Sequence, residues 1–402
     1  MLARALNASP GLGLVVGLLL ALSACAPRSS APSVGAPQQP AQTAPAPTVP
    51  RAGPAKVAIL APLGAANEKV SSDARAIVNA AQHAAQARGT GLIDLRVYDT
   101  AGDLSRTAAV ARQAVNDGAV LILGPLFGAN TPAVADAVAG RDIMVISFST
   151  DSSVAGVPIF VSGYLPEVEA ERILGFAARQ GLTTIGVYAP QTPYGEAALR
   201  GAESAAPSVG SFIATRRLYP RSFRDIQETV GDFAQDARAS GVQAVLLPDS
   251  GDGLKIVGSF LDFNGLAPAQ VKYLGLGQWE TRATLTEPAL RGGWFAGADP
   301  VAVQDFARDY SARFGATPPF IAVLGHDAVQ VAVTLAADAR RSGVDRPFTA
   351  EAIARPEGFM GALGPFRFEP DGTSRRALAV LEVGPRGFDV LDPAPVAFGP
   401  GL

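Results

Sequence analysis

From Lys56 onward, short runs of β-branched and other apolar residues alternate with longer, Ala-rich amphipathic stretches. Apolar runs of four to eight residues are typical of buried strands, and apolar positions three or four apart are typical of helices. The first part of this pattern predicts strands at 57–60, 93–99, 120–123 and 143–146. Between them it predicts helices that begin at Ser71 or Ser72, at Ser105 and at the Thr131-Pro132 pair. A strand–helix series of this kind forms a parallel sheet that helices cover on both faces.

The same series then begins again. It predicts strands at 159–161, 184–188, 212–219 and 244–247. Helices are predicted over 167–180, from Tyr194 and over 223–240. A second parallel sheet of this size predicts an α/β protein with two lobes and a cleft between them.

The order of elements differs near the end of the chain. The pattern there predicts a strand at 293–296, a helix over 303–314 and a long apolar helix over 321–342. Two further strands, at 366–368 and 377–383, flank the turn sequence Pro370-Asp371-Gly372 and predict a hairpin.

The first 24 residues have the pattern of an export signal. Arg4 precedes an apolar run of about a dozen residues, too short for a hydrocarbon core that needs about 20. Leu22-Ser23-Ala24-Cys25 resembles a bacterial lipobox, which implies that Cys25, the only cysteine, carries lipid. The alternative is an ordinary cleaved signal with an incidental cysteine. Ala26 follows the cysteine, and the absence of an Asp there resembles outer-membrane sorting in enteric bacteria, which implies a periplasmic protein anchored to the outer membrane instead of the inner one.

Residues 25–55 form the predicted lipidated Cys and a tether of mainly Ala, Pro, Ser, Gln and Thr. Such a composition cannot bury a core, and its prolines favour an extended chain. At about 3.1 Å per residue, the tether reaches up to roughly 90 Å from the membrane.

Composition narrows the functional classes. Hydrophobic residues make up 48% of the 402 residues and charged residues 17%, which provides apolar surface for large cores. The net charge of −3 gives no electrostatic footprint for nucleic acid. His83 and His326 are the only histidines, and no metal, phosphate-loop or nucleophile motif is present, so we expect neither an enzyme nor a cofactor.

Several segments in order resemble the type I periplasmic binding proteins of the leucine/isoleucine/valine-receptor kind. They are Gly124-Pro125-Leu126, Ile146 to Thr150, Tyr194-Gly195, Phe306 to Gly315 and His326 to Val329. The resemblance covers about 330 residues. It implies a two-lobed fold with three interlobe crossovers. The N-terminal lobe would hold 56–164 plus 276–358, and the C-terminal lobe 166–274 plus 360–395.

The lipobox and the tether favour one branch of this superfamily, the penicillin-binding-protein activators, which are lipid-anchored. Our first hypothesis is therefore a non-catalytic envelope lipoprotein that binds and activates a peptidoglycan synthase, a penicillin-binding protein. The alternative is a substrate-binding lipoprotein that delivers amino acids or related small solutes to an ABC permease. A third hypothesis is a sensor in which a solute changes lobe closure and so tunes a partner.

The resemblance also implies the residues of a ligand cleft. Ser149 and Thr150 match the segment that holds a ligand carboxylate, Asp249 lies where an ammonium-binding acid is expected, and Tyr194 matches a cleft aromatic. Each has a plain alternative as a helix cap, a turn former or a packing residue.

Two further positions complete the predicted cleft. Phe127 stands with Gly128 where amino-acid receptors have a serine, which argues against a standard amino-acid site. Gln278 follows the predicted second crossover. Its neighbour Trp279 is either a core residue or an interface anchor.

Overall fold

The computed structural model describes residues 53–398. The predicted signal peptide, Cys25 and the tether up to residue 52 lie outside the described residues, as do residues 399–402.

The first lobe is built on a five-stranded sheet in which every neighbouring pair is parallel, in the order β2-β1-β3-β4-β5. Its strands are β1 (Ala55–Ala61), β2 (Ile93–Asp99), β3 (Leu121–Leu123), β4 (Met144–Ser147) and β5 (Ile159–Val161). The helices that pack with this sheet are α1 (Glu68–Arg88), α2 (Leu104–Asn116), α3 (Thr131–Val138), α9 (Pro300–Phe314), α10 (Val323–Ser342) and α11 (Ala350–Ile353).

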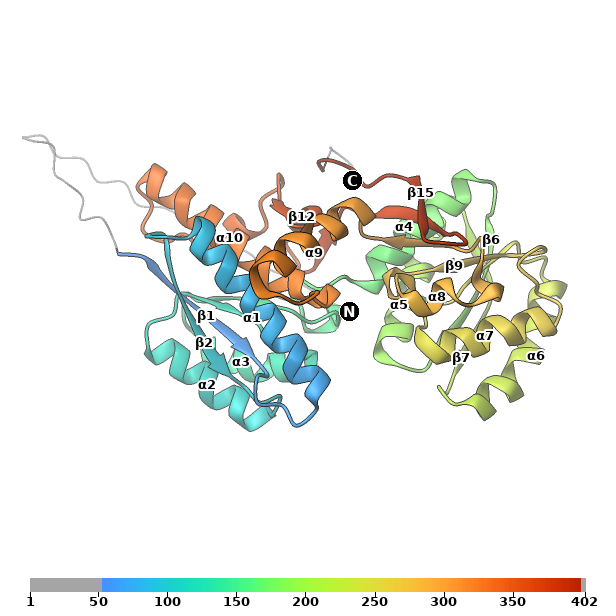
Figure 1. Ribbon diagram of the computed structural model, residues 1–402, viewed down its shortest axis with the longest axis horizontal. Helices are drawn as coiled ribbons and strands as arrows, with labels where there is room; N and C mark the ends of the chain where they lie inside the picture. Colours follow the sequence, from blue (N-terminus) through green and yellow to red (C-terminus); the bar gives the residue numbers. More distant parts are fainter. Residues whose placement is uncertain (1–52, 399–402) are drawn as a thin grey trace, which may run out of the picture. The chain divides into compact units, whose positions relative to one another are not determined.

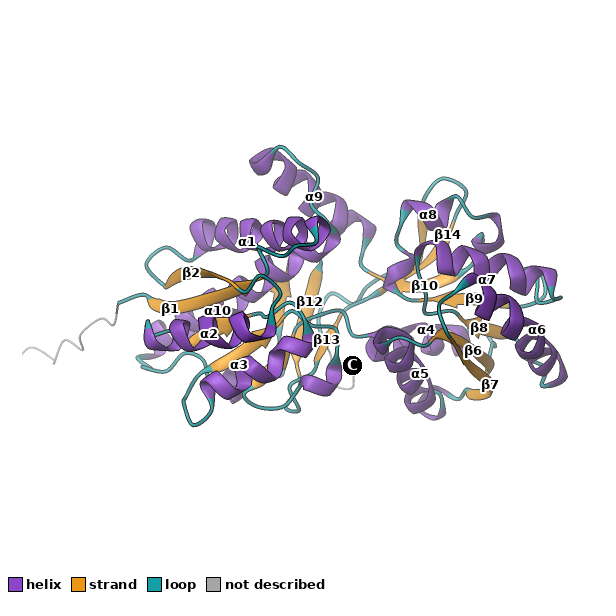
Figure 2. Ribbon diagram, turned by 90° about the horizontal axis from the view of Figure 1, so that it is seen from below, coloured by secondary structure: helices purple, strands orange, loops and turns teal. Residues whose placement is uncertain are grey.

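Strand β1 shows how this sheet is buried on both faces. Val57 and Ile59 belong to the core that contains side chains of α1 and α10, whereas Ala58 and Leu60 belong to the core with α2 and α3. Alternate residues of a strand point to opposite faces, so a strand covered on both sides is apolar throughout. Helices α1 and α10 pack against each other (Figure 1), and Figure 2 shows β1 and β2 between α1 on one side and α2 and α3 on the other.

Helix α10 is a core helix despite its composition. Phe320–Ser342 is long and apolar enough to cross a membrane, but two-thirds of its most apolar window is buried within the lobe.

The second lobe contains a seven-stranded sheet in the order β15-β14-β10-β9-β8-β6-β7. Its strands are β6 (Thr184–Pro190), β7 (Phe212–Tyr219), β8 (Ala244–Leu246), β9 (Lys272–Gly275), β10 (Trp294–Gly297), β14 (Ala379–Val383) and β15 (Phe388–Asp392), of which the last two are antiparallel additions. Its helices are α4 (Pro166–Arg179), α5 (Pro193–Ala205), α6 (Phe223–Ala239), α7 (Gly251–Phe263) and α8 (Arg282–Leu285). Helices α4 and α5 cover one face, and α6 and α7 the other.

A three-stranded antiparallel sheet completes the first lobe. It consists of β11 (Phe359–Gly361), β12 (Gly364–Phe368) and β13 (Ser374–Arg376). Phe366 and Phe368 lie in the same core as α1 and α10, and the ring centroid of Phe368 is 5.6 Å from that of Phe160. The predicted turn at Pro370-Asp371-Gly372 joins β12 to β13, not to 377–383, which instead enters the second sheet as β14.

The lobe boundaries differ from the expected ones at two of three places. The first crossover lies at 162–166, as expected. The resemblance places residues 276–297 in the N-terminal lobe, but β10 pairs with β9 and β14 in the second sheet, so the second crossover lies at about 298–300. The third lies between β13 and β14, at about 376–379, because β12 and β13 pack in the first core.

Two helix starts also differ from the prediction. Asn67, not Ser71 or Ser72, caps α1, because its side chain accepts hydrogen bonds from the Lys69 and Val70 N–H groups. Asp103 caps α2, and the Ser105 hydroxyl donates to Asp103 instead of capping the helix itself.

Candidate functional site

The residues predicted for a ligand cleft lie on the loops that follow parallel strands. Phe127, Ser149 and Thr150 follow β3 and β4 in the first lobe. Tyr194, Asp249 and Gln278 follow β6, β8 and β9 in the second. Ligands of open parallel sheets bind at this carboxyl edge, so the chain places one group of candidates on each lobe.

In the first lobe, hydroxyls form a connected network. The Ser147 hydroxyl lies 3.2 Å from that of Thr131 and donates to the Pro125 carbonyl. The Ser149 Oγ accepts a hydrogen bond of 2.9 Å from the Asp151 N–H, and Ser149 is only 4% exposed. Thr150 beside it is exposed. The edge therefore offers one fixed and one accessible hydroxyl.

Gly128 lies in the loop where the resemblance implies a serine, and a side chain at this position would be crowded. A Cβ atom at this position would lie 2.8 Å from Ser149 Oγ and 3.1 Å from Asp151 Cβ. No side chain fits there without movement of its neighbours. Phe127, which precedes the short 3₁₀ helix η1 (Gly128–Asn130), is 37% exposed.

In the second lobe, Asp249 is the centre of a buried polar cluster. Its side chain is 2% exposed, and its oxygens accept hydrogen bonds from the Tyr219 hydroxyl at 2.6 Å and the Ser250 N–H at 2.7 Å. The Arg221 Nε lies 2.9 Å from Asp249 Oδ1. Burial and the Asp249 charge raise the pKa of Tyr219, so this phenol stays a donor.

A second buried acid lies on the same lobe. Glu169 is 2% exposed and accepts a 2.6 Å hydrogen bond from the Tyr194 hydroxyl. Burial raises the pKa of Glu169 to about 8, against the lowering effect of hydrogen bonds from Tyr194 and the Gly277 N–H. Burial likewise raises the pKa of Glu280 to about 7. Tyr194 is thus fixed by a carboxyl group instead of standing free.

The two neighbours Gln278 and Trp279 differ in their exposure to solvent. Gln278 is exposed, within the short 3₁₀ helix η4 (Gly277–Trp279). Trp279 is fully buried and its indole N–H donates to the Leu247 carbonyl, so the core alternative for this residue is confirmed.

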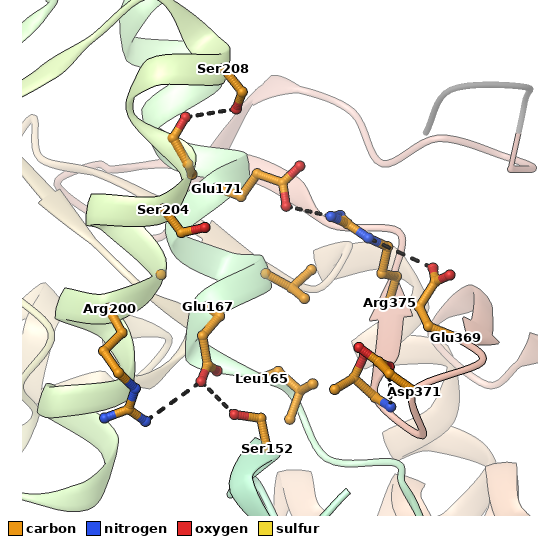
Figure 3. Close-up of a pocket in the computed structure, with 14 residues that line it drawn as sticks. Ser152, Leu165, Glu167, Glu171, Arg200, Ser204, Ser208, Glu369, Asp371 and Arg375 are labelled. Atoms are coloured by element: carbon orange, nitrogen blue, oxygen red, sulfur yellow. Dashed lines mark hydrogen bonds and ion pairs between the residues drawn. The ribbon is translucent and has the colours of Figure 1, made fainter. Parts of the chain in front are cut away.

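A polar pocket of about 550 Å³ lies between α4, α5 and the β12–β13 hairpin (Figure 3). At its rim, the Ser152 hydroxyl donates to Glu167 at 2.6 Å, and Arg375 pairs with Glu171 at 2.5 Å. Both contacts join the first lobe to α4 of the second. Among the described residues, the buried Oε2 of Glu167 has no hydrogen-bond partner.

Sequence reasoning did not identify Tyr219, Arg221 or Glu169. The first two could have been found by the rule that identified Asp249, since they lie at or just beyond the end of the predicted strand 212–219. Glu169 gives no such signal, because it lies inside a helix. Within residues 53–398, no group of three or more His, Cys, Asp or Glu side chains is arranged to hold a metal ion.

Comparisons with known proteins agree with this architecture. The sequence profile of a family described as "Periplasmic binding protein" matches residues 54–387. No protein of curated function matches the sequence significantly.

Solved structures share the fold at low identity. A putative branched-chain amino acid ABC transporter protein from Rhodospirillum rubrum is 20% identical with a TM-score of 0.72, over 84% of this chain and 100% of that one. A leucine-, isoleucine-, valine-, threonine- and alanine-binding protein from Brucella ovis is 15% identical with a TM-score of 0.66, over 87% and 97%. A solute-binding protein from R. palustris in complex with benzoate is 16% identical with a TM-score of 0.61, over 87% and 98%.

Proposed function

We infer the function from one premise, that the chain belongs to the periplasmic binding protein family. Members of this family work in the periplasm and are normally non-catalytic ligand binders. We propose that this protein is the solute-binding component of an ABC importer for small organic molecules.

One observation carries this proposal: each lobe presents polar side chains at the carboxyl edge of its own sheet, and three crossovers join the lobes. Ser149 and Thr150 lie on the first edge, and Arg221 with Asp249 on the second. A ligand that contacts both edges binds the closed arrangement better than the open one, so it shifts the population towards closure. A permease can then recognise the closed, ligand-bound form.

The test is isothermal titration of the full chain against amino acids and aromatic or aliphatic carboxylic acids, with small-angle scattering to follow closure. We expect one class to bind and to reduce the radius of gyration. A ligand at about 100 times its dissociation constant also adds about 2.7 kcal/mol of stability. Absence of binding across both classes, with unchanged solute uptake in a deletion strain, contradicts an import role.

A second candidate function is activation of a peptidoglycan synthase by direct contact. It is favoured by the engagement of Asp249 with the chain's own donors and by the loop at Gly128, where a serine does not fit. The lipobox at Cys25 and the Pro/Ala-rich tether add support from the sequence.

Crosslinking in the native envelope tests this candidate. We expect a penicillin-binding protein to co-purify with the full chain and its synthase activity to rise on addition of the chain. Failure of both, together with solute binding, leaves the importer component as the function.

A further inference from the structure

We propose that the solute is an organic acid without an ammonium group, and that Arg221 is the residue that selects it. This inference rests on the proposed solute-binding function and specifies the substrate class of the same site.

The first step concerns Asp249, the acid at the position expected to bind an ammonium group. Three donors from the chain already engage its carboxylate: the Tyr219 hydroxyl, the Ser250 N–H and the Arg221 guanidinium. Its side chain is 2% exposed. Because this carboxylate is buried and already held by these groups, a ligand ammonium cannot reach it without displacing one of them.

The local backbone holds this arrangement in place. A Cβ atom at Gly253, in the first turn of α7, would lie 2.6 Å from Asp249 Oδ2 and 3.0 Å from Arg221 Nε. Only glycine lets α7 start this close to the pair. Arg221 also donates through Nη2 to the Ser250 carbonyl at 2.6 Å, which fixes the guanidinium on the loop after β8.

The second step concerns the charge that Arg221 and Asp249 together present to a ligand. Asp249 and Arg221 together are neutral, and the accessible member of the pair is the cation, since the Arg221 side chain is 43% exposed. A guanidinium has five N–H donors in a planar fork that suits carboxylates, and the pairing with Asp249 and Ser250 uses only part of it. The exposed charge attracts a ligand carboxylate and repels an ammonium group.

Glu169, Glu280 and Asp151 do not provide an ammonium site at these edges. Glu169 is 2% exposed and bonded to Tyr194, and burial raises its pKa to about 8 and that of Glu280 to about 7. In the first lobe, Asp151 caps the short 3₁₀ helix η2 (Ser152–Val154) by accepting hydrogen bonds from the N–H and hydroxyl of Ser153. Ser149 and Thr150 contribute hydroxyls, which suit an acid or a hydroxyl of the solute.

The experiment compares pairs of compounds that differ only in the ammonium group. Leucine is paired with 4-methylpentanoate and phenylalanine with 3-phenylpropanoate, and benzoate is added as an aromatic acid. Each is titrated into the full chain by calorimetry. We expect at least one acid to bind ten-fold or more tightly than its amino-acid counterpart.

Arg221→Gln is expected to weaken that acid ten-fold or more. Arg224→Gln is the matched control, because this arginine lies three residues further on with a side chain that is 86% exposed and, within residues 53–398, pairs only with Glu228. Circular dichroism and the midpoint of thermal unfolding establish that both variants fold.

Each outcome decides one point. An amino acid that binds as tightly as its deaminated partner overturns the substrate class but leaves the solute-binding function standing. Acid binding that Arg221→Gln leaves unchanged overturns the role of Arg221. Absence of binding for all five compounds overturns the substrate class. The uptake assay of the deletion strain then decides separately whether the import role also fails.

Discussion

Arg376 and Asp327 form a buried ion pair between the end of β13, where the third crossover begins, and helix α10. Arg376 Nη1 lies 2.7 Å from Asp327 Oδ2, and the side chains are 5% and 1% exposed. Arg376 is the last residue of β13, and its Nη2 donates to the carbonyl of Ser162 in the first crossover. Burial alone raises the pKa of Asp327, but the Arg376 charge holds it below its usual value. Through these two contacts, Arg376 holds the start of the third crossover against α10 and the first crossover.

Loss of one member of this pair is expected to destabilise the fold strongly. Asp327→Asn leaves the Arg376 guanidinium buried without a counter-charge, which costs about 3–5 kcal/mol. Urea denaturation measures the change in unfolding free energy. The control is Asp305→Asn, since the Asp305–Arg308 pair is on the surface and such pairs contribute about 0–1 kcal/mol. Equal losses for the two variants would show that the buried pair has no special weight.

Glu169 is expected to make stability depend on pH. Its pKa rises from the ordinary 4.5 to about 8 in the folded state, so the folded state holds this proton more tightly than the unfolded state does. The contribution of Glu169 to stability is therefore fully present below pH 4.5, and it is lost as the pH rises towards 8. At about 1.4 kcal/mol per unit, the loss reaches up to about 5 kcal/mol.

Glu169→Gln removes this ionisation and is expected to reduce the slope of stability against pH between pH 5 and 8, leaving the part that comes from Glu280, whose pKa is raised to about 7. Denaturation curves of the variant and the wild type across that range measure the difference. Glu228→Gln, at an exposed position of α6, is the control and is expected to keep the wild-type slope. A wild-type slope in the Glu169 variant would mean that the raised pKa belongs to another group.

The Glu171–Arg375 contact at the rim of the pocket in Figure 3 is expected to shift the equilibrium between open and closed arrangements of the lobes without changing the stability of the fold. Both side chains are partly exposed, at 40% and 33%, so the pair contributes under about 1 kcal/mol. That is enough to change an open–closed ratio about two- to five-fold. Glu171→Gln should therefore alter the interlobe distance distribution while the unfolding midpoint stays the same.

This distribution is measured by double electron–electron resonance between spin labels attached at Arg141→Cys and Gln235→Cys, both at exposed positions, in a Cys25→Ser background. The Asp371→Asn variant serves as control, since Asp371 lines the same pocket but, in the described part of the chain, bonds only to Thr373 of its own hairpin. An identical distribution in the Glu171 variant would argue that the contact does not restrain the lobes.

Periodicity predicted most of the elements, because buried parallel strands are recognisable as uninterrupted apolar runs. The strands at 93–99, 159–161 and 212–219 coincide with β2, β5 and β7 at both ends. The lobe assignment beyond Gly275 was less successful. An isolated strand such as Trp294–Gly297 carries no information about which of two sheets it joins, since that depends on pairing with β9 and β14.

The candidate site was predictable only as far as position on the sheet edge. Asp249 lies after β8 as expected, but its partners Tyr219 and Arg221 come from the end of β7 and the loop after it, about 30 residues away. Whether an acid is free or engaged depends on such distant donors. Sequence patterning of one segment cannot report them, which is why the charge at this edge differs from the one that the resemblance implied.

Gly128→Ser provides the last prediction, because it restores the hydroxyl that amino-acid receptors carry in this loop. The new Cβ would lie 2.8 Å from Ser149 Oγ, so we expect a loss of about 1–3 kcal/mol in unfolding free energy and no gain of leucine binding. Ser149→Gly in the same chain removes the clashing hydroxyl and should recover part of the loss. Gly175→Ala in α4 is the control. Its Cβ has neighbours no closer than 3.5 Å, and an alanine within a helix is expected to stabilise by about 0.5–1 kcal/mol. A Gly128→Ser protein of wild-type stability that binds leucine would show that the loop adjusts easily, and that a single substitution separates this site from an amino-acid receptor.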